Sequence, residues 1–372
     1  KTTTTTHRKN TFYLEKPNFK KLAKKYKEIE KYRKGEKGYD FKTKKGNLVL
    51  TQTLLKEYYG ITHFEMPETN LVPPITNREN YIRWIKDLID MNSDNKTKKK
   101  VKGIDIGTGA SVIYPLIGTA LYKNWEFIAT EIDEKSIEYA IKNIHFNGLD
   151  ERIILLQNTQ SENLVTEEVI EEEQYDFVMM NPPFFTEEEM KKRKENPKRK
   201  QGGTRYEYIG DKIKGEEAYV KKLCEESTRF TTQIRWYTMM VGKKQTLKKT
   251  KQMLKLIPNI KHIQTTTLTT GGETRRWGIA WTYHEKPLNR EKIHIMYHRT
   301  MIMKQNNKKI EYDKMVKQQK KIKCYKEKDT YIYTRKDYPI VKLSIKEKPY
   351  IKISSITMNP LLQVVYEAFC HL

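Results

Sequence analysis

The sequence predicts an α/β fold: a doubly wound, mostly parallel sheet, with a basic helical arm before it and a small α/β domain after it. Strand-like and helix-like segments alternate between residues 101 and 284, which is typical of parallel strands joined by crossover helices. Lys and Arg outnumber Asp and Glu by 16 to 5 in residues 1–45 and by 20 to 9 in residues 285–372, but only by 36 to 33 between them. This charge pattern indicates a globular body flanked by segments that bind a polyanion, although general solubilising lysine is an alternative.

Composition is that of a soluble protein in a reducing compartment. Charged residues make up 32% of the 372 residues, and no apolar run approaches the roughly 20 residues that span a bilayer, so we expect no membrane association. The first ten residues, KTTTTTHRKN, lack the apolar segment of a secretory signal and have no initiator Met, which leaves the native N-terminus undefined. The three cysteines (Cys224, Cys324 and Cys370) are far apart, which argues against a disulfide framework or a zinc site, and we expect no metal ion.

The pattern of apolar residues predicts three domains: an arm at 1–46, a body at 47–284 and an accessory domain at 285–372. In the arm and the start of the body we expect helices at 17–33, 47–59 and 77–90. The strands of the body are expected at 101–107, 125–133, 152–157, 175–180, 234–242, 260–268 and 276–284, and the last two could run antiparallel. Its further helices are expected at 111–122, 134–149, 216–230 and 245–257, with an acidic helix between the third and fourth strands.

The accessory domain is expected to hold four β-strands and a helix. Alternating patterns predict the strands at 292–298, 330–335, 341–346 and 350–355, and helical spacing predicts the helix at 358–372. The Lys/Gln-rich run 304–328 between them is expected to be a loop or a charged helix.

A glycine turn follows the first strand of the body in "GIDIGTGAS", with Asp105, Gly107 and Gly109 between strand and helix. A ligand lying across the end of a parallel strand requires such a tight turn with bare backbone, but ordinary strand–helix turns also use glycine. Glu131 ends the second strand, where an acidic side chain can accept hydrogen bonds from ribose hydroxyls or can simply begin a helix. Together these features indicate an adenosine-containing ligand, and without a third glycine S-adenosylmethionine fits better than NAD.

The segment "YDFVMMNPPFF" ends the fourth strand with an amide, two prolines and two aromatic rings. The side-chain oxygen of Asn181 and the carbonyl of Pro182 could hold the two hydrogens of a planar amine, while Pro183 stiffens the loop. Phe184 offers a face on which a base can stack, at about 1–3 kcal/mol per base. Catalysis would then be mostly alignment, with no general base. The alternative is a proline turn with two core phenylalanines.

The segments "DIGTGAS", "ATEID", "NPPFF", "IRWYTMMVGKK" and "RRWGIAW" resemble the methyltransferase-like protein sixteen family, from about His7 to Tyr283. That family comprises eukaryotic U6 snRNA adenine-N6 methyltransferases and is related to a bacterial enzyme that methylates an adenine of 23S rRNA. The resemblance implies a class I, Rossmann-like, S-adenosylmethionine-dependent fold that methylates N6 of an unpaired, flipped-out adenosine in structured RNA, with U6 snRNA as the expected target. It also implies a nuclear location, with the cytoplasm as a second site.

Site residues follow from the resemblance position by position. The cofactor residues it implies, with those of the glycine turn, are Arg78, Asp105, Gly107, Gly109, Ser111, Glu131 and Asn181. The resemblance also implies that Arg78 reaches the carboxylate of S-adenosylmethionine. The catalytic loop comprises Asn181, Pro182, Pro183 and Phe184. The expected RNA-binding residues are Lys9, Lys42, Phe185, Lys198, Arg199, Lys200, Arg275 and Arg276. The chain departs from the family at Thr11, which replaces an arm arginine, and at Glu273, which replaces a basic residue.

Three other functions remain open from sequence. The chain could methylate ribosomal RNA, or the amide of a protein glutamine, since NPP-aromatic motifs also hold that amide, usually with Tyr; its charge of +25 weighs against the second. It could instead be a non-catalytic RNA-binding protein. The basic run 191–200 is expected to form a lid over the RNA strand, or else a solvated charged segment; protein partners cannot be assigned.

Overall fold

A computed structural model describes residues 7, 9–35, 38–91, 100–160, 162–170, 173–194, 204–268 and 275–285, together with five later strands between residues 297 and 355. The chain divides into two compact units, one comprising Lys1–Ile153 with Asn158–Leu288 and the other Ile154–Gln157 with Asn289–Leu372.

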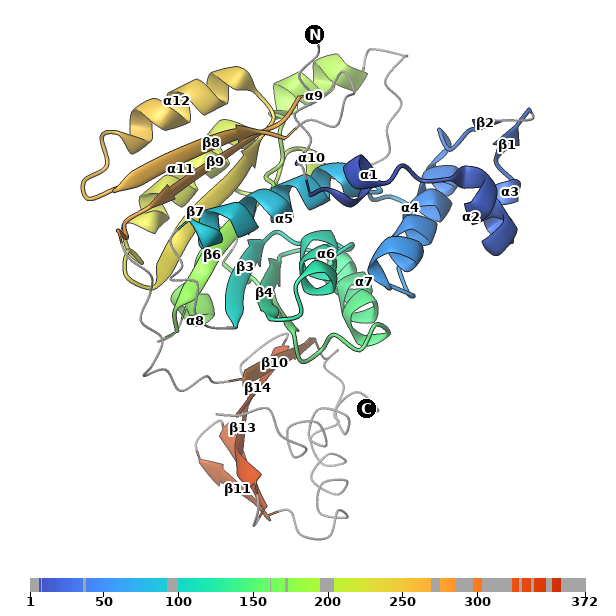
Figure 1. Cartoon of the computed structure of the whole chain (residues 1–372). Coiled ribbons are helices and arrows are strands. Elements are labelled where there is room, and N and C mark those ends of the chain that lie inside the picture. Colours follow the sequence, from blue (N-terminus) through green and yellow to red (C-terminus); the bar gives the residue numbers. More distant parts are fainter. Residues whose placement is uncertain are drawn as a thin grey trace. The chain divides into compact units, whose positions relative to one another are not determined.

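The body is built on a seven-stranded sheet (Figure 1). Its strands, in spatial order, are β5 (Ile153–Gln157), β4 (Trp125–Glu131), β3 (Val101–Ile106), β6 (Tyr175–Met180), β7 (Ile234–Val241), β9 (Trp277–Thr282) and β8 (His262–Thr267). Strand β3 pairs in parallel with β4 and β6, and β6 pairs in parallel with β7. Strand β9 runs antiparallel to both β7 and β8. The predicted mostly parallel sheet and its antiparallel end are therefore confirmed.

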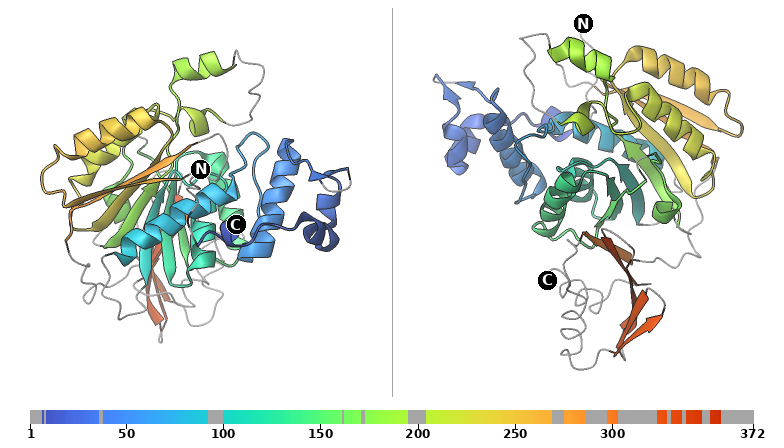
Figure 2. Two further views of the ribbon diagram at one scale, coloured as in Figure 1. Left: turned by 45° about the horizontal axis from the view of Figure 1, so that its top comes forward. Right: turned by 180° about the vertical axis from the view of Figure 1, so that it is seen from behind.

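Helices cover both faces of this sheet, as Figure 2 shows from two further directions. They are α5 (Ile75–Asp90), α6 (Ile113–Leu121), α7 (Glu134–His145), α8 (Glu167–Ile170), α11 (Glu216–Ser227) and α12 (Lys244–Leu254). On one face, the Tyr81 hydroxyl of α5 lies 2.8 Å from Thr238 Oγ1 of β7. On the other, Trp281 of β9 donates an indole N–H to Ser227 Oγ of α11 over 3.1 Å. These helices confirm the predicted segments, although the acidic helix α8 is only one turn long.

Aromatic side chains fill the core between the central strands and α6. Trp125, Phe127 and Phe177 are fully buried, with ring centroids 5.1–6.0 Å apart. Gly103 on β3 leaves room for this cluster, because an added Cβ would lie only 2.2 Å from the Phe177 ring. Close packing of this kind places the carboxyl ends of β3, β4 and β6 rigidly, and the candidate site lies there.

The arm differs from the prediction of one helix at 17–33. It forms α1 (Thr11–Leu14), α2 (Phe19–Lys25), α3 (Lys27–Glu30) and a two-stranded ribbon of β1 (Arg33–Lys34) with β2 (Gly38–Tyr39). The helix breaks at Tyr26, whose backbone is extended and whose hydroxyl donates to Glu57 over 2.7 Å. This break brings Leu22 and Ile29 into one buried cluster. Helix periodicity alone does not predict this additional burial of apolar side chains.

Helix α4 (Lys44–Tyr59) confirms the helix predicted at 47–59 and begins three residues earlier, at Lys44, directly after its N-cap Thr43. The Thr43 side chain accepts a hydrogen bond from Gly46 N–H, and Gly60 ends the helix in the left-handed conformation that favours glycine. The predicted boundary after residue 46 therefore falls inside a helix.

Two short helices after the candidate catalytic loop were not predicted: α9 (Glu187–Lys194) and α10 (Arg205–Tyr208). Helix α9 includes the first four residues of the basic run 191–200, and the rest of that run lies outside the described residues. The predicted lid therefore stays a prediction.

The second unit contains a five-stranded antiparallel sheet, one strand more than predicted. The spatial order is β10 (Tyr297–Ile302), β14 (Tyr350–Ser355), β13 (Tyr338–Ile345), β12 (Thr330–Arg335) and β11 (Lys323–Glu327). The extra strand, β11, lies in the run 304–328 that was expected to be a loop or helix; pairing with β12 compensates for its charged sequence KCYKE. Strand β10 begins near the end of the predicted strand 292–298, and the predicted helix 358–372 lies outside the described residues.

Candidate active site

The three sequence motifs of the predicted site meet at one edge of the sheet. Ile106, the last residue of β3, pairs with Thr130 of β4 on one side and with Met180 of β6 on the other. The next residues along these strands are Gly107, Glu131 and Asn181. Because adjacent strands lie about 4.8 Å apart, the glycine turn, the acid and the catalytic loop begin side by side. The register thus brings together motifs that are up to 74 residues apart in sequence.

The glycine turn leaves open space above the end of β3. Gly107 and Gly109 both have φ of +67°, which L side chains rarely adopt, and an added Cβ at either would meet nothing within 4 Å. Thr108 between them donates its hydroxyl to Asp105 Oδ2 over 2.7 Å. Ser111 is buried at the end of the turn. A turn with bare backbone and free space on its outer side suits close approach by a ligand.

Glu131 organises the turn from the adjacent strand. Its Oε2 accepts from Gly109 N–H over 2.8 Å, and its Oε1 accepts from the N–H groups of Ile132 and Asp133 over 2.8 and 3.1 Å. Burial raises the pKa of this carboxyl, and the three backbone hydrogen bonds offset part of that rise. A carboxylate has about four acceptor positions, so one remains for a ligand hydroxyl.

Asp105 is expected to make stability depend on pH. Burial raises the pKa of this carboxyl to about 7, with the Glu131 charge adding to the rise, against an ordinary value of 3.8. The Asp105 carboxyl therefore ionises near pH 4 in the unfolded chain and near pH 7 in the folded chain. The contribution of the protonated carboxyl to folding stability is full below pH 4 and is lost as pH rises through 7. Between pH 4 and 7 the wild type should lose up to about 1.4 kcal/mol per pH unit relative to Asp105→Asn. Melting temperatures of both proteins measured across this pH range test the prediction, and parallel curves would contradict it.

The NPPFF loop leaves the side-chain oxygen of Asn181 without a partner among the described residues. Asn181 Oδ1 is buried and has no hydrogen-bond partner in the described part of the chain. The two residues that follow, Pro182 and Pro183, have no backbone N–H, so the loop cannot satisfy this oxygen as an asparagine turn normally would. An unsatisfied buried acceptor costs about 1–3 kcal/mol, which indicates that a ligand donor belongs there.

The two phenylalanines of the loop have different surroundings. The Arg276 guanidinium lies over the Phe184 ring, 4.6 Å from its centroid. The end of β7 also packs against this ring, since a Cβ on Gly242 would lie 2.9 Å from Phe184 Cδ1. The Phe185 backbone N–H donates to the Tyr208 carbonyl over 2.9 Å, which ties the loop to α10. The half-buried Phe184 ring thus follows Asn181 by three residues and is held between Arg276 and the end of β7.

Helix α5 supports the site from the side. The Arg78 guanidinium lies 5.5 Å from the centroid of the Tyr114 ring on α6. One turn further on, the Tyr81 hydroxyl is 3.4 Å from the carbonyl oxygen of Met180, the residue before Asn181. The same helix therefore carries the predicted carboxylate-binding arginine and a contact to the end of β6.

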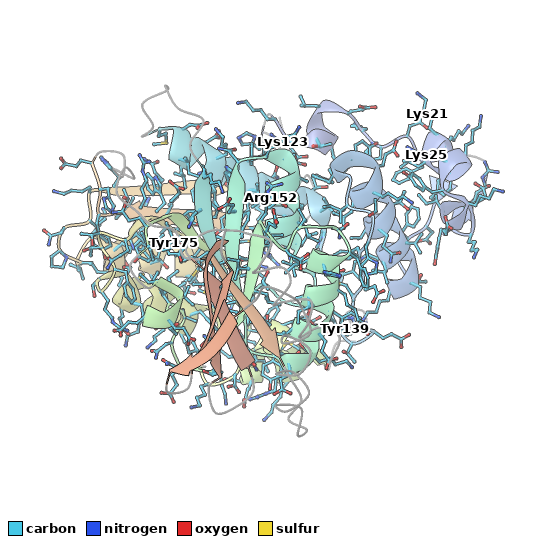
Figure 3. All side chains as sticks on the ribbon, turned by 90° about the horizontal axis from the view of Figure 1, so that it is seen from below. Lys21, Lys25, Lys123, Tyr139, Arg152 and Tyr175 are labelled. Carbon is cyan, nitrogen blue, oxygen red and sulfur yellow. The ribbon has the colours of Figure 1, made fainter. Side chains whose placement is uncertain are left out.

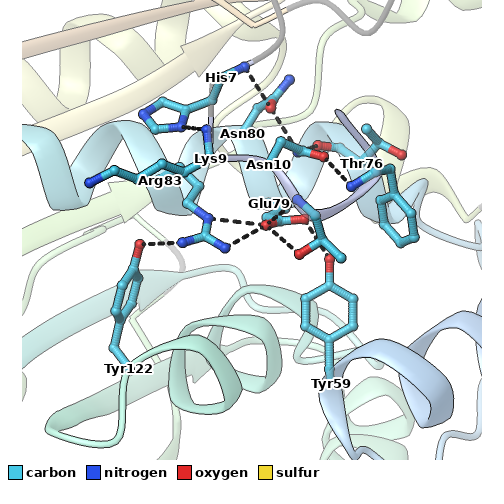
Figure 4. Close-up of polar contacts among 11 residues, drawn as sticks. His7, Lys9, Asn10, Tyr59, Thr76, Glu79, Asn80, Arg83 and Tyr122 are labelled. Carbon is cyan, nitrogen blue, oxygen red and sulfur yellow. Dashed lines mark hydrogen bonds and ion pairs between the residues drawn. The ribbon is translucent and has the colours of Figure 1, made fainter. Parts of the chain in front are cut away.

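The opposite side of α5 holds the arm through a buried carboxylate (Figure 4). Glu79 is 0% exposed, and its Oε1 accepts from both the N–H and the hydroxyl of Thr11 over 2.9 Å and from Arg83 Nε over 3.0 Å. Its Oε2 accepts from the Tyr59 hydroxyl over 2.6 Å. The fully buried Asn10 donates to the side chain of Asn80 over 2.8 Å. Thr11 thus serves to dock the arm.

The predicted RNA-binding residues within the described part of the chain lie on several elements, and their role stays a prediction. Lys9, Lys42 and Arg275 are exposed, Arg276 lies over Phe184, and 198–200 lie outside the described residues. Further exposed lysines project from α2, among them Lys21 and Lys25 (Figure 3). Within the described residues, no group of three His, Cys, Asp or Glu side chains could hold a metal ion, and no helix is long and apolar enough to cross a bilayer.

A family model described as RNA methyltransferase matches residues 1–285 of the chain. The chain belongs to this RNA methyltransferase family. The RNA N(6)-adenosine-methyltransferase mettl16 of Xenopus laevis is 36% identical over 296 residues, covering 75% of this chain and 52% of the relative. The U6 small nuclear RNA (adenine-(43)-N(6))-methyltransferase of Dictyostelium discoideum is 32% identical over 324 residues, covering 77% and 56%. The chain spans about half the length of these eukaryotic relatives.

Other members of the RNA methyltransferase family extend the comparison. The ribosomal RNA large subunit methyltransferase F of Desulfotalea psychrophila is 31% identical over 266 residues, covering 68% of this chain and 85% of the relative. The human METTL16 catalytic domain in complex with a MAT2A 3′UTR hairpin is similar with a TM-score of 0.66 at 33% identity, covering 77% of this chain and 100% of that one. The N-terminal domain of human METTL16 in complex with SAH has a TM-score of 0.62 at 34% identity, covering 75% and 99%. These similarities confirm the predicted family and its class I, Rossmann-like fold.

Several residues of this RNA methyltransferase site were missed from sequence. Tyr81 was assigned only to the apolar face of a helix, and Tyr114 was not singled out. Glu216 accepts a hydrogen bond from Gly242 N–H behind Phe184, and its place among the acidic residues that begin a helix gave no sign of this role. Glu79 was hidden in a charged helix, and no local pattern distinguishes it. Among these residues only Tyr114 has a usable signal in the sequence, because it lies three residues after Ser111 of the glycine turn.

Proposed function

We propose that this chain is an S-adenosylmethionine-dependent RNA methyltransferase that acts on N6 of an unpaired adenosine in structured RNA. The unsatisfied Asn181 oxygen beside the open glycine turn carries the proposal. An exocyclic amine has two hydrogens to donate, and an amide oxygen has no hydrogen to offer in return. The site therefore suits an amino group facing a second ligand held one strand away.

The residues at the edge of the sheet fit the cofactor. Gly107 and Gly109 leave space for it, Ser111 and Asp105 border the turn, and Glu131 keeps an acceptor position for its ribose. Arg78 would bind its carboxylate. When bound, S-adenosylmethionine supplies an electrophilic methyl group. The human relative whose structure contains SAH supports this assignment.

The chain's own residues act by alignment. Asn181 Oδ1 and the Pro182 carbonyl would hold the adenine amino group, and Phe184 would stack on the base. The target nitrogen gains one methyl group and releases one proton to water, so no side chain is assigned as a base. Positioning of this kind accounts for large rate effects without an acid–base pair. Arg276 over Phe184 would meet the adjoining phosphates of the RNA strand.

The RNA we propose is a hairpin with an unpaired adenosine, because extrusion of a base costs least where pairing is already broken. U6 snRNA is the proposed target, supported by the name of the Dictyostelium relative, and the human structures with MAT2A hairpins support structured RNA in general. A U6 target also leads us to propose residence in the nucleus, which imaging of the tagged protein would test.

Methylation of defined RNAs tests this function. The protein is incubated with a methyl-labelled cofactor and a U6-like hairpin, a 23S rRNA fragment, or the hairpin with its target adenosine paired. We expect N6-methyladenosine in the nucleoside digest of the unpaired hairpin, and at least tenfold less in the paired control. Label found in protein, or only in the ribosomal fragment, would contradict the proposed substrate.

A further inference from the structure

A second unsatisfied polar atom lies in the same region as Asn181. Tyr114 is the second residue of α6, its side chain is 4% exposed, and its buried hydroxyl has no hydrogen-bond partner within the described residues. Tyrosine hydroxyls in protein interiors nearly always have a hydrogen-bond partner, because a buried hydroxyl without one costs about 1–3 kcal/mol. The described residues therefore leave room for a further hydrogen-bond partner at this hydroxyl.

The charges around Tyr114 define which partner fits. The Arg78 guanidinium lies 5.5 Å from the ring centroid, and Tyr81 packs edge-on against the same ring at 5.6 Å. Burial raises the pKa of the Tyr114 hydroxyl far above neutrality, and the charges of Arg78, Asp105 and Arg276 all act on it. The hydroxyl is therefore a proton donor in the working pH range, with two arginines nearby.

The position of Tyr114 in the fold favours an anionic group. It lies three residues after Ser111 of the glycine turn, in the first turn of a nine-residue helix. Backbone N–H groups and the helix dipole favour negative charge at that end. Arg78, which the family resemblance assigns to the cofactor's carboxylate, is the cation closest to its ring among the contacts described.

We propose that the Tyr114 hydroxyl donates a hydrogen bond to the carboxylate of the cofactor's amino-acid moiety, beside Arg78. This inference rests on the proposed function, because it requires that the site bind S-adenosylmethionine. Tyr114 would then distinguish the complete cofactor from adenosine compounds that lack the amino-acid part. An RNA phosphate near Arg276 is the competing partner.

Two ligands separate these roles by calorimetry. S-adenosylhomocysteine carries the carboxylate, and 5′-methylthioadenosine has the same adenosine and thioether without it. For Tyr114→Phe we expect the Kd of S-adenosylhomocysteine to rise about tenfold or more, as for loss of a hydrogen bond to a charged group, and the Kd of 5′-methylthioadenosine to stay unchanged. The ligand-free melting temperature should stay the same or rise, because the substitution removes an unsatisfied hydroxyl.

Tyr122→Phe is the matched control. It removes a hydroxyl at the other end of the same helix, one that accepts from Arg83 over 3.4 Å, and should change neither Kd. Three results for Tyr114→Phe would overturn this inference and leave the proposed function intact. They are equal weakening of binding for both ligands, no weakening for either, and a raised KM for RNA with unchanged S-adenosylhomocysteine binding. Wild-type protein that binds neither ligand would overturn the proposed function as well.

Discussion

Replacing Asn181 with alanine is expected to lower kcat for methyl transfer to RNA by at least about 10²–10³-fold. Losses of this size follow removal of one preorganised hydrogen-bond partner at a reacting atom, or a misplacement of about 1 Å. The alanine removes the buried side-chain oxygen of the NPPFF loop, which has no partner among the described residues. Initial rates with labelled cofactor at saturating RNA measure the effect.

Asn181→Asp is the informative partner variant. A carboxylate keeps an acceptor oxygen at the same place, so this variant should retain more activity than alanine, despite its added charge. The alanine variant should melt within a few degrees of the wild type, because the wild-type oxygen makes no hydrogen bond to the described residues whose loss would destabilise the fold. Alanine activity above about a tenth of wild type would remove Asn181 from the proposed role.

Removing the carboxylate of Glu79 is expected to have the largest effect on stability. Glu79→Ala leaves the Arg83 guanidinium, the Tyr59 hydroxyl and both donors of Thr11 without their shared acceptor. Breaking a buried ion pair in this way costs about 3–5 kcal/mol, which corresponds to a melting temperature lower by roughly 6–15 °C. Thermal unfolding followed by circular dichroism measures the change.

Tyr59→Phe isolates one of these bonds, since it removes the hydroxyl that donates to Glu79 and keeps the ring. It should cost less than half as much as Glu79→Ala. Hydrogen exchange should also become faster at Thr11 in Glu79→Ala, because its N–H loses the acceptor that docks the arm. A melting temperature within 2 °C of wild type, with unchanged exchange, would mean that this carboxylate does not hold the arm.

Local signals were enough to predict the sheet and the row of motifs at its edge. The glycine turn, the acid at the end of β4 and the NPPFF loop each follow a short buried strand, and parallel strands bring such ends together. Gly107, Glu131 and Asn181 are therefore expected to be neighbours from the amino-acid sequence alone, and the strand register confirms that they are. The open space at the glycines and the unsatisfied Asn181 oxygen are properties of the folded chain that no local pattern encodes.

What sequence could not predict depends on partners distant in the chain. Glu79 meets Tyr59 and Thr11, 20 and 68 residues away, and nothing in a charged amphipathic helix marks it as buried. The break at Tyr26 is decided by burial of the two helices on one cluster, which overrides the helical periodicity of residues 17–33. Strand β11 forms from a lysine-rich segment because a neighbouring strand pairs with it.

A crystal structure of the protein with S-adenosylhomocysteine and a hairpin containing an unpaired adenosine tests the central claim most directly. The distance to measure joins Asn181 Oδ1 to the N6 atom of the extruded adenine. We predict a hydrogen bond of about 2.9 Å, with N6 facing the cofactor sulfur above Gly107. An adenine that remains stacked in the RNA, or one whose N6 bonds elsewhere while Asn181 stays unpaired, would contradict the account.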